Sequence, residues 1–272
     1  MTSNLQHPEL LARLAEGVSA LTSSAAWRSY LDVQRRFHRY SFRNALLISL
    51  QRPDASRVAG FAAWRKLGRT VIKGEKAIWV LAPMIYKRTS NRSGDEEEVI
   101  RGFKFAPVFD ITQTQGADLP QVCARLVGDD AGGNYAKLVD VARSIGFDVE
   151  EHDLGGRSNG DCCHTMRRIR IEREISPAQR VKTLAHELAH ALLHEKFESR
   201  SLAEMEAEST AYVVCGVLGV DSGDYSFGYL LTWAGSGDEA VAAIEASCQR
   251  IQKTAAAILQ CCEAAAGSKQ AA

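Results

Sequence analysis

The sequence predicts an α+β fold in two domains, a small α+β domain followed by a mostly helical domain with a small sheet. Its 272 residues exceed what one small core usually organises, and helical and strand periodicities both occur along the chain. Charge also divides the chain. Residues 1–115 hold 18 Lys and Arg against 10 Asp and Glu, a net charge of +8, so the remainder of this neutral chain carries −8. We therefore predict domains at residues 1–115 and 134–265, a linker at 116–133 and a tail at 266–272.

The first half contains the signals of both helices and strands. Apolar residues recur at helical spacing in residues 8–22, 26–51 and 60–67. Pro53 ends the second of these segments and Gly68 ends the third. Strands are predicted at residues 70–72 and 77–81, on either side of a turn at 73–76, and again at 99–111.

The second half begins after residues 115–133, a stretch with turn residues at both ends that contains the predicted linker at 116–133. A helix is predicted at residues 134–145 and an alternating strand at 167–171. Ser176 and Gln179 have the spacing of a capping box, and Pro177 occupies the first helical position. A long helix therefore starts at this point and continues through residue 197.

Composition excludes several classes of protein. The hydrophobic content of 46% and charged content of 24% are ordinary for a soluble globular protein. No segment approaches the run of roughly 18 apolar residues that a membrane span needs, and the amino terminus lacks the pattern of a signal peptide. The seven cysteines are odd in number and include no Cys-x-x-Cys pair. We expect a cytoplasmic protein with no membrane partner.

The strongest chemical signal is the motif formed by His186, Glu187 and His190 on the predicted long helix. Residues four apart project from the same helix face, so both imidazoles can bind one Zn²⁺ ion. Glu187 can then act as the general base, taking a proton from a water at the metal. Solvated side chains on an exposed helix are the alternative interpretation. His194 continues the stripe, and we expect it to support a ligand rather than to be one.

A third protein ligand is needed, with the fourth position left open. The next predicted helix offers Glu204, Glu206 and Glu208. Glu204 and Glu208 share one face, whereas Glu206 points about 200° away from Glu204. Glu204 is the preferred ligand, with Glu208 as the alternate ligand. Ser201 and Glu204 also have capping-box spacing, so Glu204 could instead cap its helix.

The excess positive charge of the first half predicts a polyanionic partner. Single-stranded DNA needs cations along its phosphates and aromatic faces for its bases. Residues 61–88 interleave the two types, and the preceding helix adds polar side chains. The candidate DNA contacts are Arg43, Asn44, Gln51, Trp64, Arg65, Arg69, Lys73, Lys76 and Trp79. The alternative is that both tryptophans are core residues and that the charges form a solvated face.

The stretches YSFRNALLISLQRPDASRVAGFAAWRKLGRTVIKGEKAIWVLAP and PVFDITQTQG resemble the amino-terminal single-stranded-DNA-binding domain of ArdC-like antirestriction proteins. The stretches HELAHALLH, EMEAESTAYVVCGVLGV and YSFGYLLTW resemble the zincin-like peptidase domain of ArdC and ImmA/IrrE-like proteins. Helices of the form Glu-x-x-Ala-Asp in gluzincin peptidases are similar to the segment from Glu204 to Glu208. There the first acid binds zinc and the second supports a ligand histidine, which implies that Glu208 supports a ligand histidine in this chain. The resemblance implies binding of single-stranded DNA and protection of incoming mobile DNA from restriction.

Three functions are compatible with these signals. The first is a single-stranded-DNA-binding protein that carries a zinc peptidase acting on an unknown protein or peptide. The second is a DNA-coating protein whose metal site is not catalytic. The third is an ImmA-like protease that cleaves a repressor. We favour the first, because holding a structural metal would not require Glu187.

Overall fold

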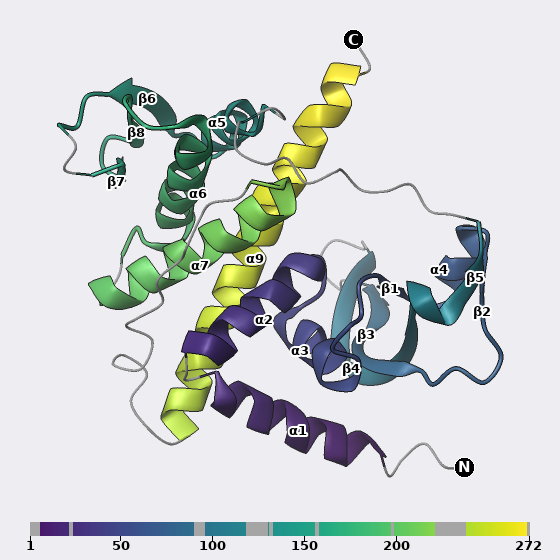
Figure 1. The fold of residues 1–272 in the computed structure, drawn as a ribbon. Coiled ribbons are helices and arrows are strands. Elements are labelled where there is room, and N and C mark those ends of the chain that lie inside the picture. The colour runs from purple at the N-terminus through teal and green to yellow at the C-terminus, as the bar shows by residue number, and fades with distance from the viewer. Residues whose placement is uncertain are drawn as a thin grey trace. The chain divides into compact units, whose positions relative to one another are not determined.

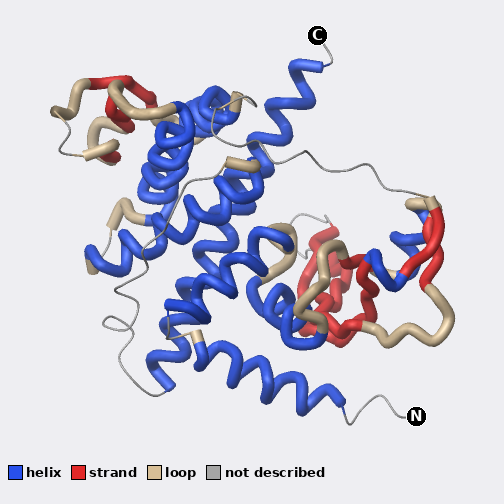
Figure 2. Tube along the Cα trace, in the orientation of Figure 1, coloured by secondary structure: helices blue, strands red, loops and turns tan. Residues whose placement is uncertain are grey.

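The computed structural model describes residues 6–21, 24–89, 96–117, 130, 133–155, 158–196, 199–220 and 238–270. The chain forms two compact units, one of residues 1–17 and 43–120 and the other of residues 18–42 and 121–272. Figures 1 and 2 show helices and strands in the first unit and a mostly helical second unit with a small sheet. The predicted α+β class with two domains is confirmed. Residues 18–42, however, belong to the second unit, which differs from the predicted boundary at 115.

The first unit contains α1 (Gln6–Ala20), α3 (Phe42–Gln51) and the short α4 (Phe61–Lys66). Helix α1 packs on α3 at Gly17, where a Cβ would lie only 3.4 Å from the side chains of Leu46 and Leu50. The buried face of α3 includes Leu47 and Ile48. Apolar residues at helical spacing thus bury one face of each helix against the other.

The strands of the first unit form two small sheets. The larger has the order β1-β4-β3 and consists of β1 (Val58–Ala59), β4 (Glu96–Asp110) and β3 (Ile78–Thr89), all antiparallel. The smaller pairs β2 (Arg69–Val71) with β5 (Thr114–Gly116), which follows the 3₁₀ turn η1 (Ile111–Gln113). The strands on either side of the predicted 73–76 turn therefore have different partners.

The helix predicted over residues 26–51 is two helices. Helix α2 (Ser24–Arg36) ends in a turn in which the Tyr40 amide donates to the Phe37 carbonyl, and α3 begins at Phe42. Helix α2 belongs to the second unit and residues 43–51 of α3 to the first. The apolar periodicity continues across the break because both helices bury a face, although in different cores.

The second unit contains α5 (Asn134–Ser144), then β6 (Asp148–His152), β7 (Gly160–Cys163) and β8 (Arg168–Glu172). These strands form a sheet of order β6-β8-β7, with β6 parallel and β7 antiparallel to the central strand. Helices α6 (Pro177–Leu193), α7 (Arg200–Leu218) and α9 (Asp238–Gln270) follow. Helix α9 extends into the predicted tail. The predicted linker at 116–133 and the stretch YSFGYLLTW lie mostly or wholly outside the described residues.

Helix α2 is part of the core of the second unit. Trp27 is fully buried, and its indole nitrogen donates a hydrogen bond to the Ser209 hydroxyl at 3.0 Å. About two turns further along α7, Gly216 leaves no room for a Cβ beside the Arg35 side chain. The Arg35 guanidinium lies 5.1 Å from the centre of the Tyr212 ring. A segment from early in the sequence therefore supports the helix that carries the candidate third ligand.

Two findings concern the chain as a whole. Among the helices that the structure describes, none is both long enough and apolar enough to span a membrane. None of the described cysteines forms a disulfide.

Candidate functional site

The histidine pair lies on α6, whose start is fixed locally. The Ser176 hydroxyl accepts a hydrogen bond from the Gln179 amide at 3.2 Å, and Pro177 follows at the first helical position. The apolar face of the helix is fully buried through Leu184 and Leu188. Burial of that face holds the helix in one rotation about its axis. His186 and His190 are consequently held on the side that faces α7.

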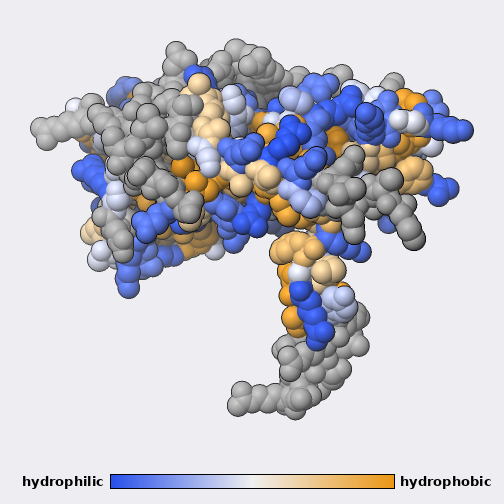
Figure 3. Space-filling view, turned by 90° about the horizontal axis from the view of Figure 1, so that it is seen from below, coloured by the Kyte–Doolittle hydropathy of each residue, from blue (hydrophilic) through white to orange (hydrophobic). Residues whose placement is uncertain are grey.

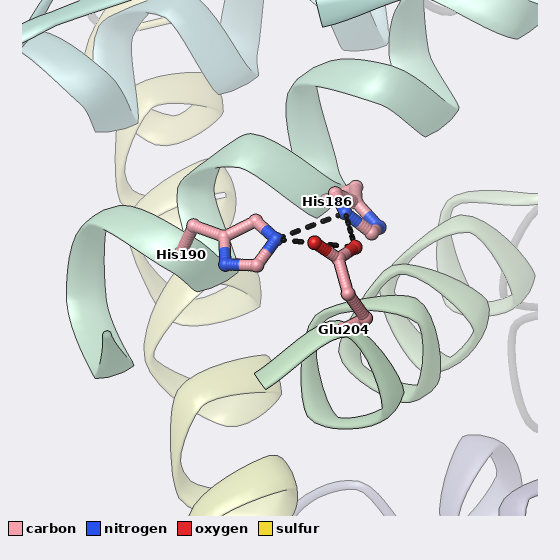
Figure 4. Close-up of side chains that lie close together, drawn as sticks. All are labelled: His186, His190 and Glu204. Carbon is pink, nitrogen blue, oxygen red and sulfur yellow. Dashed lines mark hydrogen bonds and ion pairs between the residues drawn. The ribbon is translucent and has the colours of Figure 1, made fainter. Parts of the chain in front are cut away.

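His186, His190 and Glu204 converge in Figure 4. The two histidine Nε2 atoms lie 3.1 Å apart. A Glu204 carboxylate oxygen lies 3.4 Å from Nε2 of His186 and 3.7 Å from Nε2 of His190. Ligand atoms about 2.1 Å from a tetrahedral zinc ion are about 3.4 Å from one another. The triangle therefore has the dimensions that a single ion of this kind requires, and it leaves a fourth position open.

The three acids of α7 occupy different positions. Glu204 completes the triangle, whereas a Glu208 carboxylate oxygen lies 3.1 Å from Nδ1 of His186. Glu206 is buried and bonds instead to His194 and Arg250. Helix α7 is capped by Ser199, whose hydroxyl accepts from the Leu202 amide. Glu204 thus lies beyond the capping position, so the alternative role as a helix cap is not observed.

Electrostatics at the triangle favours a cation. Burial lowers the pKa of His186, but hydrogen bonds to Glu204 and Glu208 outweigh it and raise that pKa to about 9. Hydrogen bonds from His186 and His190 hold the pKa of Glu204 well below its usual range. The carboxylates therefore stabilise positive charge at the position where the three ligand atoms meet.

Glu187 lies beside the triangle and is buried. Its pKa is raised to about 7: desolvation is the largest cause, His186 opposes the rise, and Asp161 and Glu204 add to it. Strand β7 comes very close at this point. A Cβ on Gly160 would lie 2.6 Å from the Thr183 methyl and 3.2 Å from Cγ of Glu187. The glycine therefore permits a close packing of β7 on α6 that a side chain would obstruct.

The candidate metal centre opens into a cavity of about 720 Å³. Residues of α6 and α7 form one part of its lining and the segment around β7 forms another, including Asn159, Asp161 and Cys162. In the described sheet, β7 lies at an edge and pairs only with β8. The edge strand and the three candidate ligands thus border the same space.

Asn44 and Gln51, two predicted DNA contacts, bond to the backbone of β3. The Gln51 amide donates to the Trp79 carbonyl and accepts from the Trp79 amide, both at 2.9 Å. The Asn44 amide makes the same pair of bonds with Leu81, at 2.8 and 2.7 Å. In the described sheet, β3 is an edge strand, and these two side chains bond backbone groups that a neighbouring strand would otherwise pair with. Both side chains therefore have a structural role in the first unit, and their predicted contacts with DNA stay predictions.

Trp64 and Arg69 are also buried. Trp64 is 2% exposed, and its indole nitrogen donates to the Phe109 carbonyl at 2.9 Å. The Arg69 guanidinium donates to the Thr114 hydroxyl at 2.8 Å and to the Thr114 carbonyl at 3.0 Å. Neither side chain can offer a face or a charge to DNA in this conformation. The core interpretation holds for Trp64, and the burial of the Arg69 side chain against Thr114 speaks against the predicted DNA contact there.

The remaining predicted DNA contacts reach the surface. The side chains of Arg43, Arg65, Lys73 and Lys76 are exposed, and Trp79 is half-buried. Lys76 and Trp79 line a cavity of about 830 Å³ together with Arg13 of α1 and Arg52, which follows α3. These four residues are called the basic groove below. Sequence reasoning missed Arg13 and Arg52, since only the packing of α1 on α3 brings them beside β3.

A second exposed surface lies on the outer part of the β3–β4 hairpin. Ile85, Ile100 and Phe103 are 53%, 58% and 62% exposed, and the Arg101 guanidinium lies 5.5 Å from the centre of the Tyr86 ring. Figure 3 shows apolar and charged residues side by side on the face of the molecule that it presents. The first unit therefore displays aromatic and cationic side chains beyond residues 61–88, where the sequence pattern concentrated them.

Comparison with known proteins assigns a family to each half. Residues 8–109 match the N-terminal domain of anti-restriction factor ArdC. Residues 142–213 match the IrrE N-terminal-like domain, a peptidase M78 family. The second match includes both histidines of the candidate metal centre, Glu187 and the three acids of α7.

Several individual proteins are also similar. An uncharacterized protein of Bacillus anthracis is 26% identical over 268 residues, covering 82% of this chain and 45% of its own length. The chain thus spans less than half of that relative. Crystal structures of the antirestriction ArdC protein from the R388 plasmid, metal-free and Mn(II)-bound, are 20% and 21% identical. They cover 81% of this chain and 82% and 84% of that protein, with TM-scores of 0.48 and 0.49.

The two matched families occur in the order that the sequence resemblance implied, and that resemblance is confirmed. The chain joins a region that matches the N-terminal domain of anti-restriction factor ArdC to a region that matches the IrrE N-terminal-like domain.

Proposed function

We propose that the second unit is a zinc-dependent peptidase. The observation that carries this proposal is the triangle of His186, His190 and Glu204, with the dimensions of a single metal site and Glu187 beside it. A zinc ion bound there would supply a Lewis acid that polarises a carbonyl and acidifies a water. Glu187 takes the proton of the attacking water and returns it to the leaving amine.

The cavity supports an extended peptide as the substrate. An edge strand has unpaired backbone groups, and an extended peptide can pair with them as an additional strand. Strand β7 is such an edge in the described sheet and borders the candidate metal centre. Main-chain pairing with β7 would hold a peptide beside Glu187 without demanding one side-chain sequence. Restriction or repressor proteins with exposed flexible segments are the substrates to test first.

The test separates metal binding from hydrolysis. His186→Ala or Glu204→Ala should abolish stoichiometric zinc, measured by elemental analysis of purified protein, because each removes a ligand of a three-ligand site. Glu187→Gln should keep the zinc and lose cleavage of a peptide library, because the amide cannot accept the proton. Retention of full zinc by the Glu204→Ala protein would refute this ligand set. Cleavage by Glu187→Gln at the rate of the parent chain would refute the role of the base.

We propose, as a second function, that the first unit binds single-stranded DNA through the basic groove. Arg13, Arg52 and Lys76 place three cations around Trp79, against the single acid Glu9 among the described lining residues. Cations of this kind bind phosphates, and the half-buried indole of Trp79 lines the same cavity. The net charge of +8 over residues 1–115 supports the same partner. Protection of incoming mobile DNA is the role that such binding would serve.

Salt dependence distinguishes the two kinds of DNA contact. Each phosphate contact removed, by Arg13→Gln or Lys76→Gln, should reduce the logarithmic salt slope of binding by about 0.7. Trp79→Ala should weaken binding by roughly 1–3 kcal/mol with little change of slope. Fluorescence anisotropy with a short single strand measures both quantities, with Lys66→Gln, an exposed change outside the groove, as the control. Tighter binding of the duplex of equal length, or a slope unchanged by both substitutions, would contradict this proposal.

A further inference from the structure

A continuous line of hydrogen bonds connects α9 with the candidate metal centre. Nδ1 of His190 lies 3.0 Å from Nδ1 of His194, and Nε2 of His194 lies 3.2 Å from a Glu206 carboxylate oxygen. The Arg250 guanidinium donates to the same carboxylate at 3.0 Å and to the Ser247 hydroxyl at 3.0 Å. Helix α9 is thus connected with a candidate ligand through two intermediate side chains.

The two intermediate side chains are deeply buried. His194 is 5% exposed and Glu206 is 2% exposed. Water cannot readily replace a lost partner at such positions, so each group depends on the protein for its hydrogen bonds. The Glu206 carboxylate in particular requires the positive charge of Arg250 beside it.

The direction of the protons along this line follows from its two ends. The Glu206 carboxylate can only accept, so Nε2 of His194 donates to it. Nε2 of His190 needs its lone pair to bind a metal, so the proton of that ring is on Nδ1. Nδ1 of His190 therefore donates to Nδ1 of His194. One arrangement of protons satisfies all the groups and leaves the metal-binding atom of His190 unprotonated.

We infer that Arg250 is a positioning residue for the metal centre, acting through Glu206 and His194 on the orientation and tautomer of His190. This inference rests on the proposed metal site and goes beyond its ligands. Arg250 lies 60 residues after His190 in the sequence, on a helix that contributes no ligand to the triangle. Without its guanidinium, the Glu206 carboxylate loses the group that fixes it, and His194 is no longer held against His190.

Zinc affinity of the full chain tests the inference. Removing an outer partner of a ligand histidine typically weakens metal binding 10–100-fold. Competition with a chelator should therefore show a loss of about that size for Arg250→Met, and Arg250→Lys should retain most of the affinity. Lys253→Met is the matched control, since Lys253 is an exposed cation on the same helix, and it should leave affinity unchanged. The absorption spectrum of the cobalt(II)-loaded protein should shift for Arg250→Met alone.

A double-mutant cycle separates positioning from general loss of structure. If Arg250 acts through His194, then His194→Phe already interrupts the line. Arg250→Met added to that variant should change affinity by about twofold or less. Full additivity of the two losses, or an unchanged affinity for Arg250→Met in a chain that binds zinc, would overturn the inference. A parent chain that takes up no zinc would instead refute the metal site itself.

Discussion

At the scale of single residues, closely spaced side chains have different tasks because their surroundings differ. Glu204, Glu206 and Glu208 lie within one and a half turns of α7. Glu204 lies beside Nε2 of His186 in the triangle, Glu206 is buried against Arg250, and Glu208 lies beside Nδ1 of His186. Their roles follow from which neighbour each reaches across the helix interface.

The first unit also contains a buried acid, Asp110. Its carboxylate accepts hydrogen bonds from the amides of Ser56, Arg57 and Thr112 and from the Thr112 hydroxyl, between 2.8 and 3.0 Å. Burial raises the pKa of this carboxyl, but the four hydrogen bonds outweigh it, so the pKa lies below the ordinary 3.8. The ionised form is therefore the form that the fold stabilises.

The sign of the pH dependence at Asp110 follows from that lowered pKa. Its contribution to stability is present above the unfolded pKa near 3.8 and is lost as the pH falls through the lower folded value. Asp110→Asn should lower the free energy of unfolding at pH 7 by about 1–3 kcal/mol. Urea unfolding at pH 7 and below pH 4 measures the difference between variant and parent. A difference that grew as the pH fell would contradict this account.

At the scale of elements, the close contact of β7 with α6 determines the shape of the candidate site. Gly160 faces Thr183 and Glu187 with no room for a Cβ. Gly160→Ala should displace the strand and destabilise the protein by about 1–3 kcal/mol. It should also reduce any peptide cleavage, because the edge strand β7 would move away from Glu187, the proposed base.

A compensating change provides the control for Gly160. The nearest atom to the added Cβ is the Thr183 methyl group, at 2.6 Å. Thr183→Ser removes that methyl and should restore part of the stability and cleavage lost in Gly160→Ala. Thermal unfolding and peptide cleavage of the double variant measure the recovery. If Gly160→Ala were as stable as the parent, the close contact would not be what constrains β7.

At the scale of the whole molecule, each of the two units is built from two separate stretches of the chain. Helix α2 precedes most of the first unit in sequence yet belongs to the second. It supports α7 through Trp27 and Arg35. A division at residues 116–133 would therefore separate α2 from the core that it completes.

This arrangement predicts the behaviour of a carboxy-terminal fragment. Residues 132–272 lack α2 and should expose the α7 surface that Trp27 covers. Loss of a buried Trp alone typically costs about 3–5 kcal/mol. Circular dichroism and zinc content should show a less stable fragment that holds less metal than the full chain, and addition of an α2 peptide should recover part of both. A fragment that unfolds cooperatively at the temperature of the full chain would show that α2 is dispensable.

Much of the fold and of the candidate site could be predicted from local pattern. The four-residue spacing of His186 and His190 places both on one helix face in any context, and Ser176 with Pro177 starts that helix. Family resemblance was equally accessible, since it depends on the order of residues alone. One continuous helix was predicted over 26–51, whereas the structure has two. Apolar periodicity indicates that a helix face is buried, but it does not show that α2 and α3 are buried in different cores.

By itself, the sequence determined the α+β class, the two families, the histidine pair with its neighbouring glutamate, and the division of charge. Only the tertiary structure decided which acid of α7 completes the triangle, that Trp64 is buried while Trp79 borders a groove, and that Arg250 reaches Glu206. Helical spacing is a local property of the backbone. Burial and contact between distant segments depend on how helices and strands pack together, and no short stretch of sequence contains that information.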